Sequence, residues 1–175
     1  MINPQASAAA SFSTELADLE PNLRAWAIRA TGDPEAARDL VQDTLAAGLE
    51  TQARFDGRST LRTWLIGVLS HKIADHFRKR YRAPFDSSEA EPLDLRTTPT
   101  ESEVERVVMA RRDLSRVDRA LAELPPGERL ALLLVGVEGV DHAEACREMD
   151  VSATHLRVLL HRGRHRLRRM LEREL

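Results

Sequence analysis

The sequence is poor in cysteine, lysine and aromatic residues, and it has no long hydrophobic run. Its single cysteine, Cys146, excludes an internal disulfide framework and a cysteine-rich zinc site. The longest apolar run covers residues 130–135, whereas a helix that spans a bilayer needs about 20 apolar residues. Residues 1–13 also lack the basic start and apolar core of a secretory signal, so we expect a cytoplasmic protein.

The 175-residue chain has little net charge, formally −2 at pH 7, which excludes a uniformly basic nucleic-acid coat protein and a strongly acidic tail protein. Its acidic and basic residues are nevertheless separated into blocks. The net charge is −5 over residues 14–53, +6 over 54–82, −6 over 83–105 and +3 over 106–175. This segregation predicts separate surfaces for separate partners.

Apolar residues recur at helical spacing along most of the chain, and no segment shows a sustained period of two. We therefore predict an all-α fold. In the first half, the pattern predicts three helices, over about residues 14–30, 34–52 and 61–82.

Residue types at the ends of these helices support the prediction. The segment between the first two helices carries residue types preferred at helix ends: Gly32 suits a C-cap, Asp33 an N-cap and Pro34 a first helical position. Gly57 is the turn residue of a basic loop before the third helix, which Ser59 or Thr60 can cap.

Residues 83–105 differ from the rest of the chain, because prolines, serines, threonines and acids replace the apolar pattern. This composition predicts a flexible acidic linker. The linker would join two small helical domains, residues 14–82 and 106–175, and residues 1–13 would form a disordered N-terminal tail.

Helical spacing resumes from about residue 103 and continues, after a proline break, to about Val137. Asp141 and Glu144 then form a capping signature for a short helix. A tight turn follows, and Ser152 is the expected N-cap of a final helix that begins at Ala153. A short helix, a turn and a longer helix have the spacing of a helix-turn-helix.

The final helix is strongly cationic: six arginines and no acid lie between Ala153 and Arg169. Arginine pairs with phosphate oxygens, and the N-terminus of such a helix can reach base edges in the major groove. We predict that it binds DNA. A solvated basic helix is the alternative, and the complete lack of acids directly after the turn argues against it.

The basic block 54–82 combines arginines with four of the seven aromatic residues, which suits unstacked bases better than a closed duplex. The alternative is that these rings belong to the core. That alternative is favoured for Trp64, which has apolar neighbours, while Phe55 and Tyr81 at the helix margins fit both.

Catalysis and metal binding have little support in the sequence. Cys146 has no identifiable partner base, and His71 and His76 are not spaced as a pair of ligands on a helix. Arginines surround the histidines of the final helix and disfavour a cation. We therefore expect no catalytic residue, no metal and no cofactor, and we do not expect an enzyme.

Two stretches of the first domain, GDPEAARDLVQDTLAAGLE and RFDGRSTLRTWLIGVLSHKIADHFRKRYR, are similar to sigma region 2. Two stretches of the second domain are similar to sigma region 4: ALAELPPGERLALLL and HAEACREMDVSATHLRVLLHRGRHRLRRML. In this order, they resemble the extracytoplasmic-function (ECF) group of bacterial sigma-70-family factors. The resemblance covers about residues 15–82 and 106–172. It implies a sigma factor that binds core RNA polymerase and directs promoter recognition, DNA melting and transcription initiation.

The resemblance also implies where each partner binds. The family's region 2 helix binds the clamp helices of the polymerase β′ subunit, and the polymerase β flap is a further expected contact. Alone, the helical spacing that places Asp39, Gln42 and Asp43 on one face would more often indicate a solvated surface. The residues carried over onto the docking site are Asp39, Leu40, Gln42, Asp43 and Thr44.

The DNA sites are carried over in the same way. The loop 54–59 and the following helix correspond to the part that melts and reads the −10 element, with its bases unstacked. The residues implied are Arg54, Phe55, Arg58, Arg62, Trp64, His71, Lys72, Arg78, Lys79, Arg80 and Tyr81. The final helix corresponds to the reader of the −35 element. The residues implied are Ser152, Thr154, His155, Arg157, Val158, His161, Arg162 and Arg164.

The chain departs from the family's pattern in its DNA-reading helices. His155 begins the sequence HLRVL where the family has Thr-Val-Lys-Ser-Arg, Asp150 replaces the turn glycine, and His71 replaces an asparagine. The usual Ile-Ala is Ala145-Cys146. These departures leave the promoter sequence open and the expected architecture unchanged.

Two other functions compete with a sigma factor. A helix-turn-helix regulator with an N-terminal sensing or dimerisation domain leaves the basic, aromatic block 54–82 unexplained. A helical adaptor with charged faces does not account for the arginine-rich final helix. Only a sigma factor predicts a stoichiometric holoenzyme with core polymerase, and the family also implies an anti-sigma factor as a partner.

Overall fold

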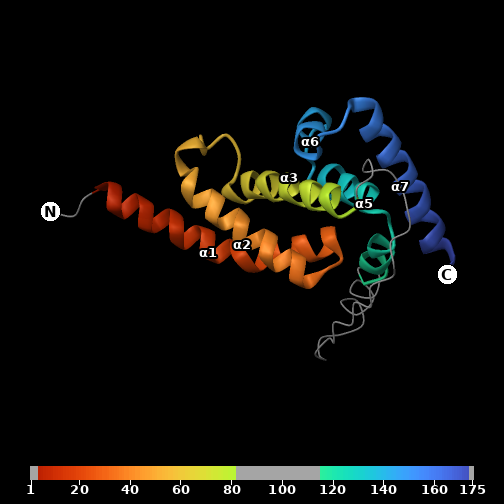
Figure 1. Ribbon diagram of the computed structural model, residues 1–175, viewed down its shortest axis with the longest axis horizontal. Coiled ribbons are helices and arrows are strands. Elements are labelled where there is room, and N and C mark those ends of the chain that lie inside the picture. The colour runs from red at the N-terminus through yellow and green to blue at the C-terminus, as the bar shows by residue number, and fades with distance from the viewer. Residues whose placement is uncertain (1–3, 82–114, 174–175) are drawn as a thin grey trace, which may run out of the picture. The chain divides into compact units, whose positions relative to one another are not determined.

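The computed structural model describes residues 4–81 and 115–173, and every regular element in these ranges is helical (Figure 1). The prediction of an all-α fold is confirmed. The linker 83–105 and most of the helix expected from about residue 103 lie outside the described residues. Contacts divide the chain into two compact units, Met1–His76 and Phe77–Leu175.

The first unit consists of the α-helices α1 and α2, a short 3₁₀ helix η1, and α3 as far as His76, while the end of α3 belongs to the second unit. Their bounds are Pro4–Thr31, Pro34–Glu50, Gln52–Arg54 and Leu61–Tyr81. Helices α1 and α2 pack along each other (Figure 1). Buried apolar side chains from all three α-helices form the core, among them Leu23, Trp26, Val41, Leu65 and Leu69.

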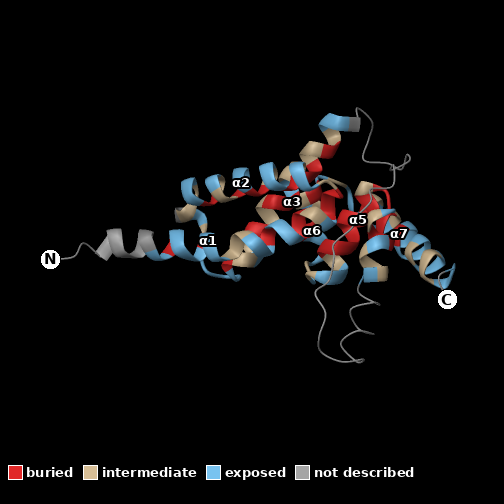
Figure 2. Cartoon of the chain, turned by 90° about the horizontal axis from the view of Figure 1, so that it is seen from below, coloured by how far each residue is buried: buried red, intermediate tan, exposed pale blue. Residues whose placement is uncertain are grey.

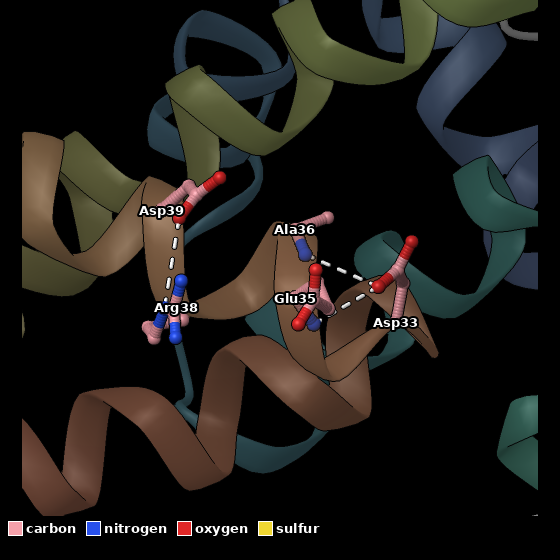
Figure 3. Close-up of polar contacts among 5 residues, drawn as sticks. All are labelled: Asp33, Glu35, Ala36, Arg38 and Asp39. Carbon is pink, nitrogen blue, oxygen red and sulfur yellow. Dashed lines mark hydrogen bonds and ion pairs between the residues drawn. The ribbon is translucent and has the colours of Figure 1, made fainter.

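The expected cap between α1 and α2 is present. Gly32 has a positive φ of 71°, which ends α1. Asp33 then accepts hydrogen bonds from the backbone N–H groups of Glu35 and Ala36 at 3.0 and 3.1 Å, and Pro34 is the first residue of α2 (Figure 3).

The prediction of a disordered tail over residues 1–13 is wrong from residue 4 onward, because α1 begins at Pro4 rather than near residue 14. Three consecutive alanines, residues 8–10, favour the helix locally. Phe12 gives the extension a tertiary contact, since its ring is buried and only 6.4 Å from that of Phe55.

The second unit contains a helical segment over residues 115–122, then α5, the π-helix η2, α6 and α7. The bounds of these four elements are Pro126–Ala131, Leu132–Val137, His142–Met149 and Ala153–Arg173. Helix α7 packs against α5, η2 and α6. Their facing sides are buried, and the outer side of α7 is exposed (Figure 2).

The segment expected to be one α-helix up to Val137 widens into a π-helix at Leu132. The N–H of Glu138 donates to the carbonyl of Leu133 at 3.0 Å, five residues back. Val137, the last residue of the π-helix, is 63% exposed, and Gly139 with a φ of 69° follows the end of the element as expected.

Candidate nucleic-acid interface

Side-chain caps and a left-handed turn fix the direction of α7. Asp141 accepts hydrogen bonds from the N–H groups of Ala143 and Glu144, which starts α6, and these contacts lower the pKa of its carboxyl. Asp150 has a φ of 52°, a conformation in which aspartate is tolerated better than most residues. The hydroxyl of Ser152 accepts from the N–H of His155 at 3.1 Å, which starts α7. The predicted helix-turn-helix caps are confirmed.

The turn also explains one departure from the family's pattern. The left-handed conformation at Asp150 suits glycine best, and glycine is the residue that the resemblance stated above implies at this position. Aspartate can occupy this position because it tolerates the left-handed conformation better than most residues.

Helix α7 divides into a buried side and a cationic outer side. Leu156, Leu159, Leu160 and Gly163 are buried. Most of the predicted −35 residues are exposed: Ser152, Thr154, Arg157, His161, Arg162 and Arg164. His155 and Val158 are half-buried, and the hydroxyl of Ser152 is engaged in the cap.

A close crossing holds α7 against the helices below it. A Cβ placed on Gly163 would lie only 3.0 Å from Cδ1 of Leu132 and 3.3 Å from Cβ of Glu128. The side chain of Glu128 is buried, and its Oε2 lies 3.5 Å from Nε of Arg166. Arg129, beside it, donates to the carbonyls of Ala122 and Leu124 at 2.7 and 2.9 Å. Neither of these two buried charges could be predicted from the sequence, because they carry no periodic signal.

A pocket of about 330 Å³ lies where one flank of α7 meets the start of α6, and buried Leu160 forms part of its wall. Arginines and histidines supply its polar lining: His142, Arg157, His161, Arg164, His165 and Arg168. Helical spacing from Arg157 to Arg168 could have revealed the α7 part of this lining. His142 could not have been found in this way, because it comes from another helix.

The exposed side of α2 is acidic. Asp39, Gln42 and Asp43 are exposed, as expected for a docking face, and Leu40 is half-buried. Arg38 Nε lies 3.8 Å from Asp39 Oδ1 at the edge of this face (Figure 3). Thr44 does not join it: its side chain is buried, and its hydroxyl donates to the carbonyl of Leu40 at 2.7 Å.

The predicted −10 residues on α3 fall into separate groups. Trp64, His71 and Arg78 follow one another at seven-residue intervals and so lie along one side of the helix, with Lys72 and Lys79 beside them. Arg62 and Arg80 lie on another side, and Nε of Arg62 donates to Oδ1 of Asn22 on α1 at 2.7 Å. The side chain of Tyr81 lies outside the described set.

An aromatic cluster supports the loop before α3. The ring of half-buried Phe55 is tilted between those of Phe12 and Trp64, with centroids 6.4 and 5.6 Å away. Arg54 and Arg58 are exposed on either side. Phe12 is not among the predicted site residues, because residues 1–13 are predicted to form a tail.

Other site classes have little support in the structure. Among the described residues, no group of three or more histidine, cysteine or acidic side chains could hold a metal ion. No helix in the described ranges is long and apolar enough to cross a membrane. Cys146 is half-buried in α6.

Comparisons with known proteins identify both halves of the chain. Residues 16–83 match the Sigma-70 region 2 family, and residues 114–167 match the Sigma-70, region 4 family. The ECF RNA polymerase sigma factor EcfG of Rhodopseudomonas palustris is 30% identical over 151 residues, which cover 86% of this chain and 80% of that protein. The ECF RNA polymerase sigma factor SigF of Caulobacter vibrioides is 30% identical over 158 residues, which cover 88% of this chain and 82% of that protein.

Solved structures agree with these matches. The sigma factor RpoE of Bartonella quintana, in complex with the anti-sigma factor NepR, is 29% identical, with a TM-score of 0.65 over 93% of this chain and 97% of that chain. CnrH, in complex with the cytosolic domain of CnrY, shares the fold at 24% identity and a TM-score of 0.54.

Proposed function

The chain belongs to the ECF group of RNA polymerase sigma factors, which act in promoter recognition and transcription initiation, and from this we propose which of its surfaces meets each partner. The strongest support comes from α7, a capped helix with a buried apolar side and no acid between Ala153 and Arg169. Helix α7 would enter the major groove of the −35 element.

Within α7, the first turns would carry the base contacts. Thr154, Arg157 and His161 are exposed and lie on the outer side of the helix, nearly opposite the buried leucines. Arg162 and Arg164 lie on its flanks and would hold phosphates. Ser152 would act mainly as the cap that aims the helix.

The acidic side of α2 would dock on core RNA polymerase, at the clamp helices of β′. Asp39, Gln42 and Asp43 would make the polar contacts, with Leu40 at the margin. Thr44 would contribute by packing inside the unit, because its side chain is buried and its hydroxyl is satisfied by the helix.

The loop after η1 and the exposed side of α3 would open and hold the −10 element. Arg54 and Arg58 are exposed and would meet phosphates at the loop, and exposed His71 with half-buried Trp64 would line the path of the single strand. Arg78 is half-buried and its Nη1 donates to the carbonyl of Met149 at 2.9 Å, so it would support the fold more than it would meet DNA. Lys72 and Lys79 would add charge beside that path. Arg62 would brace α3 against α1 through Asn22.

The two DNA-binding parts would correspond to domains over residues 14–82 and 106–175, joined by the acidic segment 83–105. A tether makes the second contact intramolecular, so two weak sites can together bind a promoter tightly. The acidic segments would repel free DNA and make promoter binding depend on polymerase. We also propose cytoplasmic action, no catalytic activity of its own, and regulation by an anti-sigma factor.

Reconstitution with core RNA polymerase tests the proposal. The chain and core enzyme should co-elute as a stoichiometric holoenzyme, which should produce run-off transcripts from a subset of a promoter library. The selected promoters should share two elements, and core enzyme alone should select none. Failure to form a holoenzyme would contradict the proposal, as would specific promoter binding by the isolated chain as tight as that of the holoenzyme.

A further inference from the structure

The first part of α1 lies outside the segment that matches region 2, because α1 begins at Pro4 and the match begins at residue 16. Within residues 11–15, Phe12 is the buried position, and its side chain is only 8% exposed. Leu16, one turn further on, is buried on the same side of the helix. The extension of α1 therefore packs against the rest of the first unit through the ring of Phe12.

The ring of Phe12 meets the loop that precedes α3. Its centroid lies 6.4 Å from that of Phe55, at an interplanar angle of 47°. Phe55 directly follows η1 and is in turn tilted by 48° against Trp64, in the first turn of α3, with centroids 5.6 Å apart. Tilted rings at these separations attract each other beyond the effect of their burial. The three rings therefore link α1 to the start of the loop and to the start of α3.

Hydrogen bonds of short range shape the rest of this loop. Oδ1 of Asp56 accepts from the N–H of Arg58 at 3.1 Å, which forms a tight turn. Oγ1 of Thr60 accepts from the N–H of Thr63 at 3.1 Å and caps α3. These bonds join residues two or three positions apart, so they shape the loop without fixing it on α1. The ring of Phe55 is what anchors the loop on α1.

Such an anchor matters at the step in which the loop captures a single strand. A loop that is already ordered loses little conformational entropy on binding, whereas a loose loop binds more weakly. Loss of the Phe12 ring would leave space beside Phe55, into which the ring of Phe55 could turn. The neighbouring cations Arg54 and Arg58 would then lose their fixed positions on the strand's path. Duplex binding by α7 does not use this loop and would be unaffected.

We propose that Phe12 is a positioning residue for capture of the −10 strand: its ring holds Phe55, and through it the loop 54–59, in the arrangement that receives the displaced strand. The inference rests on the proposed −10 role of this loop. It gives a part of α1 that precedes the region 2 match an influence on initiation, exerted by a residue that does not itself touch DNA.

The experiment compares two ligands of the reconstituted holoenzyme, both taken from a selected promoter. One is a single-stranded oligonucleotide with the non-template −10 sequence, and the other is the −35 duplex. Phe12→Leu removes the ring and keeps an apolar side chain that favours a helix. Leu23→Ala is the matched control, because it truncates a fully buried residue about three turns further along α1. Each variant is assayed as purified stoichiometric holoenzyme, so unfolded chains do not contribute.

Phe12→Leu should bind the oligonucleotide about three- to tenfold more weakly than the wild type, the effect of losing one aromatic pair. Its affinity for the −35 duplex should be unchanged, and Leu23→Ala should bind both ligands like the wild type. Adding Phe12→Leu to Phe55→Leu should cause no further loss, because Phe12 acts through Phe55. A residue that only stabilises the fold would not produce this coupling.

Three results would overturn the proposal: equal oligonucleotide binding by Phe12→Leu and the wild type, an equal loss in Leu23→Ala, or fully additive losses in the double variant. The second would leave Phe12 a role in stability alone, and the third would show that it acts independently of Phe55. If the wild-type holoenzyme binds the −35 duplex and not the oligonucleotide, the proposed −10 role of the loop fails as well.

Discussion

The ring of Phe55 lies 5.6 Å from that of Trp64 at an interplanar angle of 48°, an arrangement that ties the loop before α3 to the helix itself. Phe12 contacts Phe55 from the other side, with centroids 6.4 Å apart. Two of the predicted −10 aromatics, Phe55 and Trp64, are thus part of a cluster that α1 completes, and stacking of bases on them would depend on how firmly the cluster is held.

Removing the Phe12 ring should therefore destabilise the first unit. We expect Phe12→Ala to lower its free energy of unfolding by about 3 kcal/mol, because a buried phenylalanine is lost. Urea unfolding, followed by the fluorescence of Trp26 and Trp64, the two tryptophans of the chain, measures this free energy. Ser11→Ala, on the exposed side of α1, should unfold like the wild type. An unchanged midpoint in Phe12→Ala would show that the extension of α1 makes no stable contact.

Reversing a charge on the acidic side of α2 should abolish polymerase binding. Asp43→Arg places a cation where the proposal requires an acid, and the site is exposed, so the fold should survive. Co-elution with core polymerase measures binding, and circular dichroism checks the fold. Asp18→Arg makes the same change on the exposed side of α1 and should leave the holoenzyme intact. Holoenzyme formation by Asp43→Arg would move the docking site elsewhere.

Local signals in the sequence predicted the caps of α6 and α7 correctly. Asp141 and Ser152 could be identified as caps because capping depends on residue types a few positions apart. The π-helix at Leu132 has no comparable signal, and neither has the contact of Phe12 with Phe55, which joins residues far apart in the chain.

The candidate sites show the same limit. Spacing alone placed Asp39, Gln42 and Asp43 on one side of a helix, and the structure agrees that all three are exposed. Helical spacing did not show that the side chain of Thr44 is buried, because neighbouring positions on a helix point in different directions and Thr44 directly follows exposed Asp43. His142 lines the α7 pocket only because α6 packs on α7, which is a tertiary contact.

Truncating Arg157 should weaken −35 recognition. If it pairs with a base, Arg157→Ala should cost about 1–3 kcal/mol on the selected promoter and much less on scrambled DNA. Holoenzyme binding to both duplexes measures the difference. Arg173→Ala, near the far end of α7, removes the same charge and should affect both duplexes equally and weakly. If Arg157→Ala weakens binding to both duplexes equally, Arg157 contacts a phosphate and not a base.

Glu148 should make the stability of the second unit depend on pH. Burial is the main cause that raises its pKa from 4.5 to about 7, and the carboxylates of Glu144 and Asp141 add to the effect. Between these values, the folded chain holds a proton that the unfolded chain has lost. The free energy of unfolding should therefore fall as the pH rises from 4.5 to 7 and change little above that.

Glu148→Gln removes the titrating group and should flatten this profile. We expect it to stabilise the second unit at pH 8 by about 1–2 kcal/mol, an amount reduced for partial exposure, and to have little effect near pH 4.5. Hydrogen exchange of the α6 and α7 amides, corrected for the intrinsic rate at each pH, measures this locally. Glu172→Gln, which is exposed on α7, should follow the wild type. An unchanged profile in Glu148→Gln would mean that its carboxyl is hydrated in the folded state.

The close crossing at Gly163 should not tolerate even a methyl group. Gly163→Ala would place a Cβ 3.0 Å from Cδ1 of Leu132 and 3.3 Å from Cβ of Glu128, so α7 would have to shift. We expect a loss of about 1–3 kcal/mol in the stability of the second unit, and weaker −35 binding as the helix moves. Gly136→Ala is the matched control, because its Cβ would have no neighbour within 4 Å and alanine favours a helix. Hydrogen exchange of the α7 amides should separate the two variants, and equal protection in both would show that the crossing can relax.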